Sequence, residues 1–229
     1  MTRTLPFAAA LGLAALAAAP AQANLLINPG FESGLTGWTT SGNVFDISCA
    51  GIPPGCAPGG GSRIATLNDA SLPNTGIGSA SLSRAVTVPG PGTFAFGAVF
   101  SYATVLPAAG NFTQGQISLT VQGGGPSVTL GFDPNALASQ FTISGFAGFS
   151  FTAWIPLSGT LAYAGPGPAS LLLTISVQNA TADNRLVLDV DNVFLRAVTV
   201  EVPEPAALAL LGLGLVALAA LRRAAPARA

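Results

Sequence analysis

Residues 116–122 read Gln-Ile-Ser-Leu-Thr-Val-Gln, and residues 170–178 read Ser-Leu-Leu-Leu-Thr-Ile-Ser-Val-Gln. Apolar and polar residues alternate throughout the first stretch. In the second, every odd-numbered residue from Leu171 to Val177 is apolar. Because successive side chains of a β-strand point to opposite faces, each stretch predicts a strand with one buried face and one solvated face.

The same two-residue period recurs along most of the chain. We predict further strands at Val44–Ser48, Arg63–Leu67, Ser79–Val88, Phe94–Thr104, Val128–Phe132 and Arg185–Val200, and we expect Phe149, Phe151 and Ile155 to share a face. Gly and Pro clusters separate these stretches, and only residues 133–137 resemble a helix start. The pattern predicts an all-β fold, an antiparallel β-sandwich.

The composition excludes several kinds of functional site. The 229 residues include no His, and the eight basic residues are all Arg, against nine acidic residues and a formal net charge of −1. The chain therefore lacks an imidazole base, a Schiff-base or P-loop lysine, and a His-ligated metal site. A weakly acidic chain without a basic cluster binds nucleic acid poorly, so we expect no nucleic-acid partner.

The first 23 residues have the pattern of a secretory signal peptide. A positively charged start (Met1-Thr2-Arg3) precedes an apolar run at residues 5–19, and Ala21-Gln22-Ala23 forms an A-x-A cleavage site. We expect signal peptidase to cleave after Ala23. The alternative is an N-terminal membrane anchor, for which the apolar run is short.

A second apolar segment lies at the C-terminal end. Val202-Pro203-Glu204-Pro205 precedes 16 residues without a polar side chain (206–221), and Arg222-Arg223 follows them. As a single hydrophobic helix this segment would span about 24 Å, against about 30 Å for a hydrocarbon core. The positive-inside rule keeps the Arg pair in the cytoplasm, which agrees with export of the preceding residues. Composition leaves two interpretations, a permanent anchor in the inner membrane and a sorting tail that is removed.

The order of these C-terminal parts resembles the PEP-CTERM sorting signal. The residues that match its recognition element and its basic end are Pro203, Glu204, Pro205, Arg222 and Arg223. The resemblance implies that exosortase, a membrane enzyme of Gram-negative bacteria that make exopolysaccharide, processes the chain near Pro-Glu-Pro. It also implies release or attachment at the cell surface or in the extracellular matrix.

The chain therefore divides into a signal peptide (1–23), one domain (24–201) and a sorting signal (202–229). The central part is long enough for a single core without metals or many disulfides. Cys49 and Cys56 are its only cysteines, and export to an oxidising compartment predicts a disulfide between them. Closing so short a loop contributes roughly 2–3 kcal/mol in the chain-entropy model.

The two ends of the central domain have distinctive sequences. Residues 24–34 read N-L-L-I-N-P-G-F-E-S-G, with Gly-Trp at 37–38, and residues 188–195 read L-D-V-D-N-V-F-L. They resemble the opening and closing segments of galactose-binding-like jelly rolls, the fold of many carbohydrate-binding modules. The resemblance implies that the all-β fold is an antiparallel jelly-roll β-sandwich. Residues 79–102 resemble that family's paired core strands. Pro29 and Asn192 depart from the family's pattern.

The resemblance implies a structural Ca²⁺ where the first and last strands lie together. Glu32 and Asp191 occupy the matching positions, and hard oxygen ligands of this kind suit Ca²⁺. Asp189 has the same parity as Asp191, so both side chains are expected to project to one side. The alternative is two solvated acids and a capping Glu32.

Two further functions depend on Trp154 and on the carboxylates. Trp154 is out of phase with its apolar neighbours and is expected to face away from the core, where it is a candidate for glycan stacking or covers loops. Glu32 with Asp189 or Asp191 is the only carboxylate pair that the motifs place together, as a glycosidase would require. A structural metal explains that pair better, and a serine hydrolase would lack its base. We therefore expect no enzymatic activity.

Together these features predict an exported, exosortase-processed, non-catalytic β-sandwich of the cell surface or extracellular matrix. We expect it to associate with exopolysaccharide or biofilm. A carbohydrate-binding protein with a defined glycan ligand is the alternative, and a purely structural spacer is equally consistent with the sequence.

Overall fold

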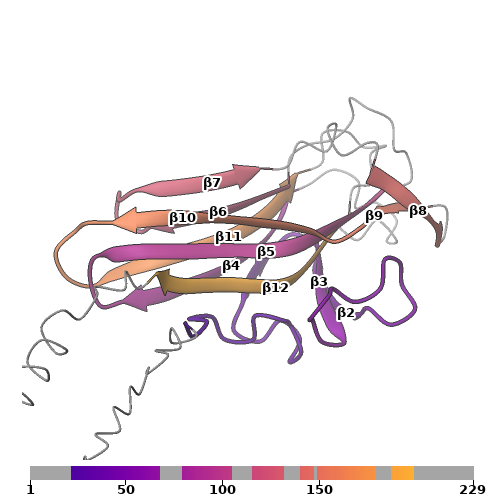
Figure 1. Ribbon diagram of the computed structural model, residues 1–229, viewed down its shortest axis with the longest axis horizontal. Helices are drawn as coiled ribbons and strands as arrows, with labels where there is room; N and C mark the ends of the chain where they lie inside the picture. Colours follow the sequence, from indigo (N-terminus) through magenta and orange to yellow (C-terminus); the bar gives the residue numbers. More distant parts are fainter. Residues whose placement is uncertain are drawn as a thin grey trace, which may run out of the picture. The chain divides into compact units, whose positions relative to one another are not determined.

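The computed structural model describes residues 22–67, 79–104, 115–131, 140–146, 149–178 and 187–198. Within these ranges the chain forms twelve β-strands and no α-helix (Figure 1). One compact unit ends at Ala197, and a second begins at Val198, the only residue of that unit in the described ranges. Most of the predicted signal peptide, the helix start at 133–137 and the sorting signal lie outside the described residues.

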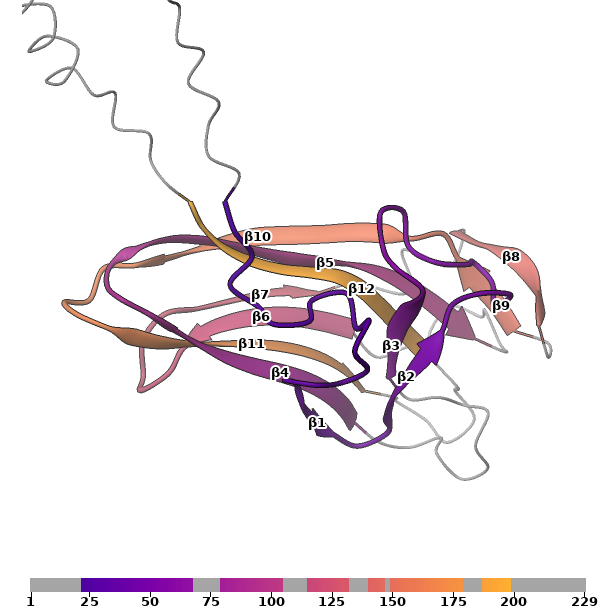
Figure 2. The same cartoon turned by 90° about the horizontal axis from the view of Figure 1, so that it is seen from below.

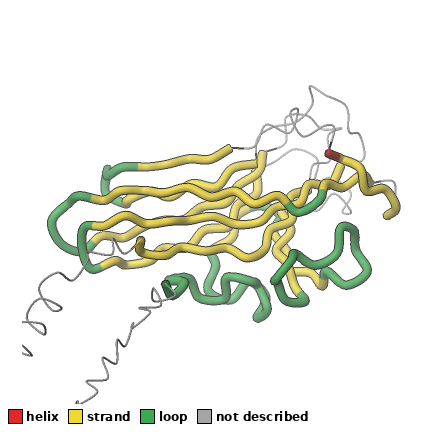
Figure 3. The backbone as a smooth tube through the Cα atoms, in the orientation of Figure 1, coloured by secondary structure: helices red, strands yellow, loops and turns green. Residues whose placement is uncertain are grey.

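Loops and turns separate the strands (Figure 3). The strands are β1 (Thr39–Ser41), β2 (Val44–Ser48), β3 (Arg63–Leu67), β4 (Ser79–Val88), β5 (Gly92–Thr104), β6 (Gly115–Val121), β7 (Ser127–Gly131), β8 (Phe141–Phe146), β9 (Phe149–Thr152), β10 (Ile155–Tyr163), β11 (Ala169–Gln178) and β12 (Val187–Val198). The bounds of β2, β3 and β4 are those predicted from the sequence. Strands β1, β8 and β10 were not predicted.

The sequence of strand β10 does not show a clear alternation of apolar and polar residues. Its alternating pattern is interrupted by Pro156 and Gly159, residues that normally weaken a strand. It nevertheless pairs with β5 in antiparallel register along its whole length. Ile155 therefore begins a new strand and packs against the main core, whereas Phe149 and Phe151 belong to a separate small cluster. The expectation that these three residues share a face was wrong.

The strands form two antiparallel sheets. The first has the order β1-β4-β11-β6-β7, and the second has the order β2-β3-β12-β5-β9-β8, with β10 also paired to β5. Consecutive strands such as β4 and β5, or β11 and β12, lie in different sheets, so the chain crosses repeatedly between the two layers (Figure 2). This is the predicted all-β jelly-roll sandwich.

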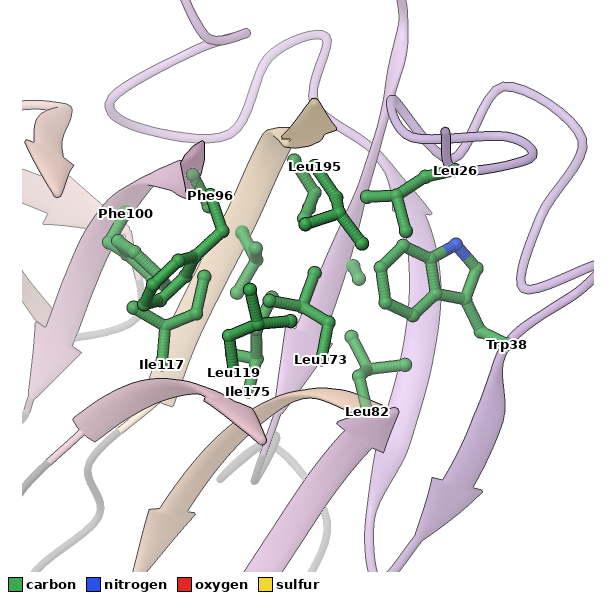
Figure 4. Packing of buried hydrophobic residues seen from close by; sticks show 14 of the residues in the cluster. Leu26, Trp38, Leu82, Phe96, Phe100, Ile117, Leu119, Leu173, Ile175 and Leu195 are labelled. Carbon is green, nitrogen blue, oxygen red and sulfur yellow. The ribbon is translucent and has the colours of Figure 1, made fainter. Parts of the chain in front are cut away.

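The inner faces of the two sheets form one hydrophobic core (Figure 4). Phe96 and Phe100 from β5 meet Ile117 and Leu119 from β6, and all four side chains are completely buried. Trp38 closes one side of this core at 8% exposure (Figure 4). The alternation in the sequence is thus the alternation between this core and the outer faces.

Along strand β12, the residues that face the core switch from even-numbered to odd-numbered positions. Even-numbered residues as far as Val190 contribute to the core, and odd-numbered residues contribute from Val193 onward. Asn192 lies between them with a φ of 50°, a left-handed conformation that Asn tolerates better than most residues. Before this irregularity, Asp189 and Asp191 lie on the outer face of the second sheet.

Candidate metal centre and binding face

The opening loop (residues 24–34) is organised by the side chain of Asn28. Its Nδ2 donates a hydrogen bond of 2.7 Å to the carbonyl of Gly34. Asn28 and Phe31 both have positive φ angles, of 52° and 57°. This tight path places the Phe31 ring in the core at 0% exposure and leaves the adjacent Glu32 exposed.

The carboxylate of Glu32 joins the opening loop to the start of β3. Its Oε1 accepts hydrogen bonds from the amides of Ser62 (2.8 Å) and Arg63 (2.9 Å), and its Oε2 accepts one from the Ser62 hydroxyl at 3.0 Å. The Arg63 and Ser62 amides hold the pKa of Glu32 below its usual value. Glu32 is therefore an ionised acceptor at neutral pH.

Asp191 presents the opposite electrostatic situation. Its side chain is completely buried; Oδ1 accepts a 2.7 Å hydrogen bond from the Asn192 amide, while Oδ2 has no hydrogen-bond partner in the described part of the chain. Burial, and to a smaller extent the nearby charge of Glu32, raise the pKa of Asp191 to about 6. A buried carboxylate beside a second carboxylate is unfavourable unless a proton or a cation neutralises it.

Two glycines allow the backbone to reach both carboxylates. A Cβ atom on Gly60 would overlap Asp191 Oδ2, and one on Gly61 would overlap the carboxylate of Glu32. The carbonyl of Pro58, two residues earlier, accepts a 3.1 Å hydrogen bond from the Asn192 side chain. The segment before β3 therefore places its backbone directly against the two acids, with the Ala57 carbonyl beside Gly60.

The structure brings Glu32 and Asp191 together but places Asp189 elsewhere. Asp189 is buried, and its Oδ1 accepts a 2.7 Å hydrogen bond from the Thr66 hydroxyl on the neighbouring strand β3. The described residues contain no group of three or more His, Cys, Asp or Glu side chains that could hold a metal. Two carboxylates and nearby carbonyls remain, an all-oxygen donor set that fits a hard cation such as Ca²⁺.

The disulfide loop (residues 49–62) connects β2 to β3. The disulfide predicted from the sequence joins Cys49 to Cys56 within it. Trp154, which is half-buried, donates its indole N–H to the carbonyl of Gly55 at 3.0 Å. The structure thus places Trp154 against this loop, as the loop-covering interpretation expected.

The outer face of the first sheet has regular polar chemistry. Strand pairings align one hydroxyl-bearing residue from every strand in a row across the sheet, and the row consists of Thr39, Ser83, Thr174, Ser118 and Thr129. The adjacent row consists of Ser41, Ser81, Ser176 and Gln116. We call these two rows the hydroxyl face. At the usual strand spacing it is about 19 Å wide.

No charged residue occupies an outward position on the described strands of this sheet. Arg84 lies on β4, but it shares the register of the core residue Leu173 and donates to the carbonyl of Gly37. The described acids Glu32, Asp46, Asp189 and Asp191 lie in the opening loop or in the second sheet. The alternation predicted which residues point outward, but their alignment depends on strand register and was not predicted.

The C-terminal part of the chain matches a protein-family model. The PEP-CTERM protein-sorting motif covers residues 201–224, which include Pro203–Pro205 and the Arg222-Arg223 pair. The chain carries a PEP-CTERM sorting motif. The motif indicates an exported, membrane-anchored precursor that exosortase processes. No helix among the described residues is long and apolar enough to cross a membrane, and the predicted helix at 206–221 lies outside them.

Solved structures with a similar fold include several carbohydrate-binding modules. The chain is 18% identical to TmCBM61, which was solved with β-1,4-galactotriose; the TM-score is 0.44, and the match covers 77% of this chain and 99% of that one. The family 16 carbohydrate-binding module-2 is 14% identical to the chain, with a TM-score of 0.45; the match covers 75% of this chain and 99% of that one. The K3 cleaved adhesin domain of Lys-gingipain from Porphyromonas gingivalis is 15% identical to the chain, with a TM-score of 0.39; the match covers 76% of this chain and 98% of that one. No curated protein matches the chain. Similarity at this level carries no functional information.

Proposed function

We propose that this PEP-CTERM protein is a non-catalytic β-sandwich of the cell surface or extracellular matrix that associates with exopolysaccharide. The sorting motif at residues 201–224 carries the proposal, because such a motif indicates an exported precursor that exosortase processes. A domain delivered by this route acts where secreted polymers accumulate. The partners are signal peptidase and exosortase during maturation, and polysaccharide afterwards.

The hydroxyl face supports an uncharged polysaccharide as the polymer. Each protein–sugar hydrogen bond has a net value of only about 0.5–1.5 kcal/mol, so useful affinity requires many of them. Two in-register rows on a rigid sheet provide such a set, and short Ser and Thr side chains lose little conformational entropy when a ligand orders them. Among the described residues, the hydroxyl face carries no fixed charge that would need desolvation, which favours a neutral polymer over an acidic one.

We further propose that Ca²⁺ binds between Glu32 and Asp191. The two carboxylates and the carbonyl oxygens of residues 57–61 would hold the ion. Ca²⁺ would neutralise the buried charge of Asp191 and join the opening loop to β12. The Thr66 contact of Asp189 supports leaving that residue out of the ligand set.

The geometry of the carboxylates also favours a non-catalytic role. Glu32 accepts three hydrogen bonds and has a lowered pKa, so it remains ionised and is a poor general acid. Asp191 is completely buried, so a glycosidic bond has no access to it. A glycosidase needs one carboxylic acid and one carboxylate flanking the substrate.

Co-sedimentation of the mature exported protein with insoluble neutral and acidic polysaccharides tests the polysaccharide proposal. The double substitution Ser118→Glu/Thr174→Glu places two charges in the centre of the hydroxyl face and should abolish retention by a neutral polymer. Thr160→Glu, on the exposed side of β10 in the other sheet, is the matched control and should bind as wild type does. Equal retention of all three proteins, or no retention of wild type by any neutral polymer, would refute the proposal.

A further inference from the structure

We propose that the Cys49–Cys56 disulfide is a positioning element for the Glu32–Asp191 ion site, so that the site reaches full affinity only after the cysteines are oxidised outside the cytoplasm. The inference rests on the proposed Ca²⁺ site. Its basis is the arrangement of the disulfide loop, whose two halves reach the two carboxylates separately.

The first half connects Cys49 to Glu32. The Cys49 side chain is completely buried, and its amide donates a 3.1 Å hydrogen bond to the carbonyl of Ser62. Ser62 uses its amide and its hydroxyl to hold Glu32. Displacement of Cys49 would therefore disturb the residue that fixes the first carboxylate.

The second half connects Cys56 to Asp191. Cys56 is followed by Ala57, which is only 4% exposed and whose carbonyl accepts a 2.9 Å hydrogen bond from the amide of Gly60. Gly60 lies directly against Asp191 Oδ2. The turn that places Gly60 against the second carboxylate thus begins one residue after the disulfide.

Reduction would remove the covalent closure of residues 50–55, in which Gly51 and Gly55 have positive φ angles. The hydrogen bonds that remain are two local turns, one bond from the Ala50 amide to the Ser48 hydroxyl, and the bond from Trp154 to the Gly55 carbonyl. For a sequence separation of 7, the chain-entropy model gives about 2.5 kcal/mol for the closure. If ion binding must supply all of this ordering, the Kd for Ca²⁺ rises by ~60-fold, at 1.36 kcal/mol per factor of ten.

Formation of the disulfide joins the two sulfur atoms and releases two protons and two electrons. The electrons pass to the disulfide of an extracytoplasmic thiol oxidoreductase, which is reduced to its dithiol. In the experiment below, a water-soluble phosphine supplies the two electrons in the opposite direction and is oxidised to its phosphine oxide.

Calorimetric titration with Ca²⁺ of the mature exported protein tests the inference in three states: oxidised, phosphine-reduced, and as the Cys49→Ser/Cys56→Ser variant. We expect the Kd to be roughly 10- to 60-fold higher in the last two states. Val88→Ala, a core substitution on β4, is the control for lowered stability and should leave the Kd unchanged. Reduction of wild type provides the measurement if the double variant does not fold.

A second measurement needs no metal. Hydrogen exchange of the Ser62 and Arg63 amides, which donate to Glu32, should accelerate on reduction in the presence of EGTA while exchange in β11 stays slow. Equal Kd values in the oxidised and reduced states would overturn the positioning role and leave the ion site intact. Absence of Ca²⁺ binding by the oxidised protein would overturn the ion site, and this inference with it.

Discussion

Substitution of Asp191 by Asn should stabilise the metal-free protein at neutral pH and remove its response to Ca²⁺. The pKa of Asp191 is raised from 3.8 to about 6, chiefly because the carboxyl is buried. The native state therefore holds this proton more tightly than the unfolded chain does. The associated stability is fully present below about pH 4 and is lost as the pH rises through about 6.

The size of the effect follows from the two pKa values. The difference between 3.8 and about 6 corresponds to ~3 kcal/mol at 1.36 kcal/mol per pH unit. The amide side chain of the Asp191→Asn variant would carry no charge, and its carbonyl oxygen can still accept the hydrogen bond from the Asn192 amide. At 2–4 °C per kcal/mol for a domain of this size, the melting temperature of the variant should rise by up to about 6–12 °C at pH 7.5.

Thermal melting from pH 4 to pH 8, with EGTA and with excess Ca²⁺, is the assay. In EGTA, wild type should lose stability relative to Asp191→Asn between pH 4 and pH 6.5. Ca²⁺ should restore it in wild type only. Comparison with the variant at each pH cancels the contribution of Glu32, whose lowered pKa acts in the opposite direction. A variant that is less stable than wild type in EGTA at pH 7.5, or that keeps the full Ca²⁺ response, would contradict the reasoning.

Three further substitutions test other parts of the structure. Glu32→Gln should lower the melting temperature at pH 7, and the difference should shrink as the pH falls through the lowered pKa of Glu32; a constant difference across pH would point to packing instead. Trp154→Phe should lower stability by about 1 kcal/mol through loss of the bond to Gly55, measured by urea unfolding, and should leave polysaccharide retention unchanged if Trp154 covers the loop and does not stack on glycan. Leu173→Ala, in the centre of the core, should cost about 2–5 kcal/mol in the same assay, and a loss below 1 kcal/mol would contradict the packing described.

Much of the strand content was visible in the sequence because burial on one face leaves a local two-residue pattern. The bounds of β2, β3 and β4 followed from that pattern directly. It failed where other residues obscured it, as Pro156 and Gly159 do in β10, or where the strand has only three residues, as in β1. The same alternation predicted that the side chains of Asp189 and Asp191 project from one side of their strand. It could not show that the Thr66 hydroxyl donates a hydrogen bond to Asp189 and not to Asp191.

The sequence by itself determined the sandwich class, the disulfide and the sorting motif, because each depends on residue types at short separations. Tertiary structure alone decided the register that aligns Thr39 with Thr129 across five strands, and that Asp191, not Asp189, is the acid beside Glu32. Both arrangements join residues far apart in the chain. Their formation depends on how the two sheets pack and on which glycines allow the backbone to approach the acids, and a local period contains neither kind of information.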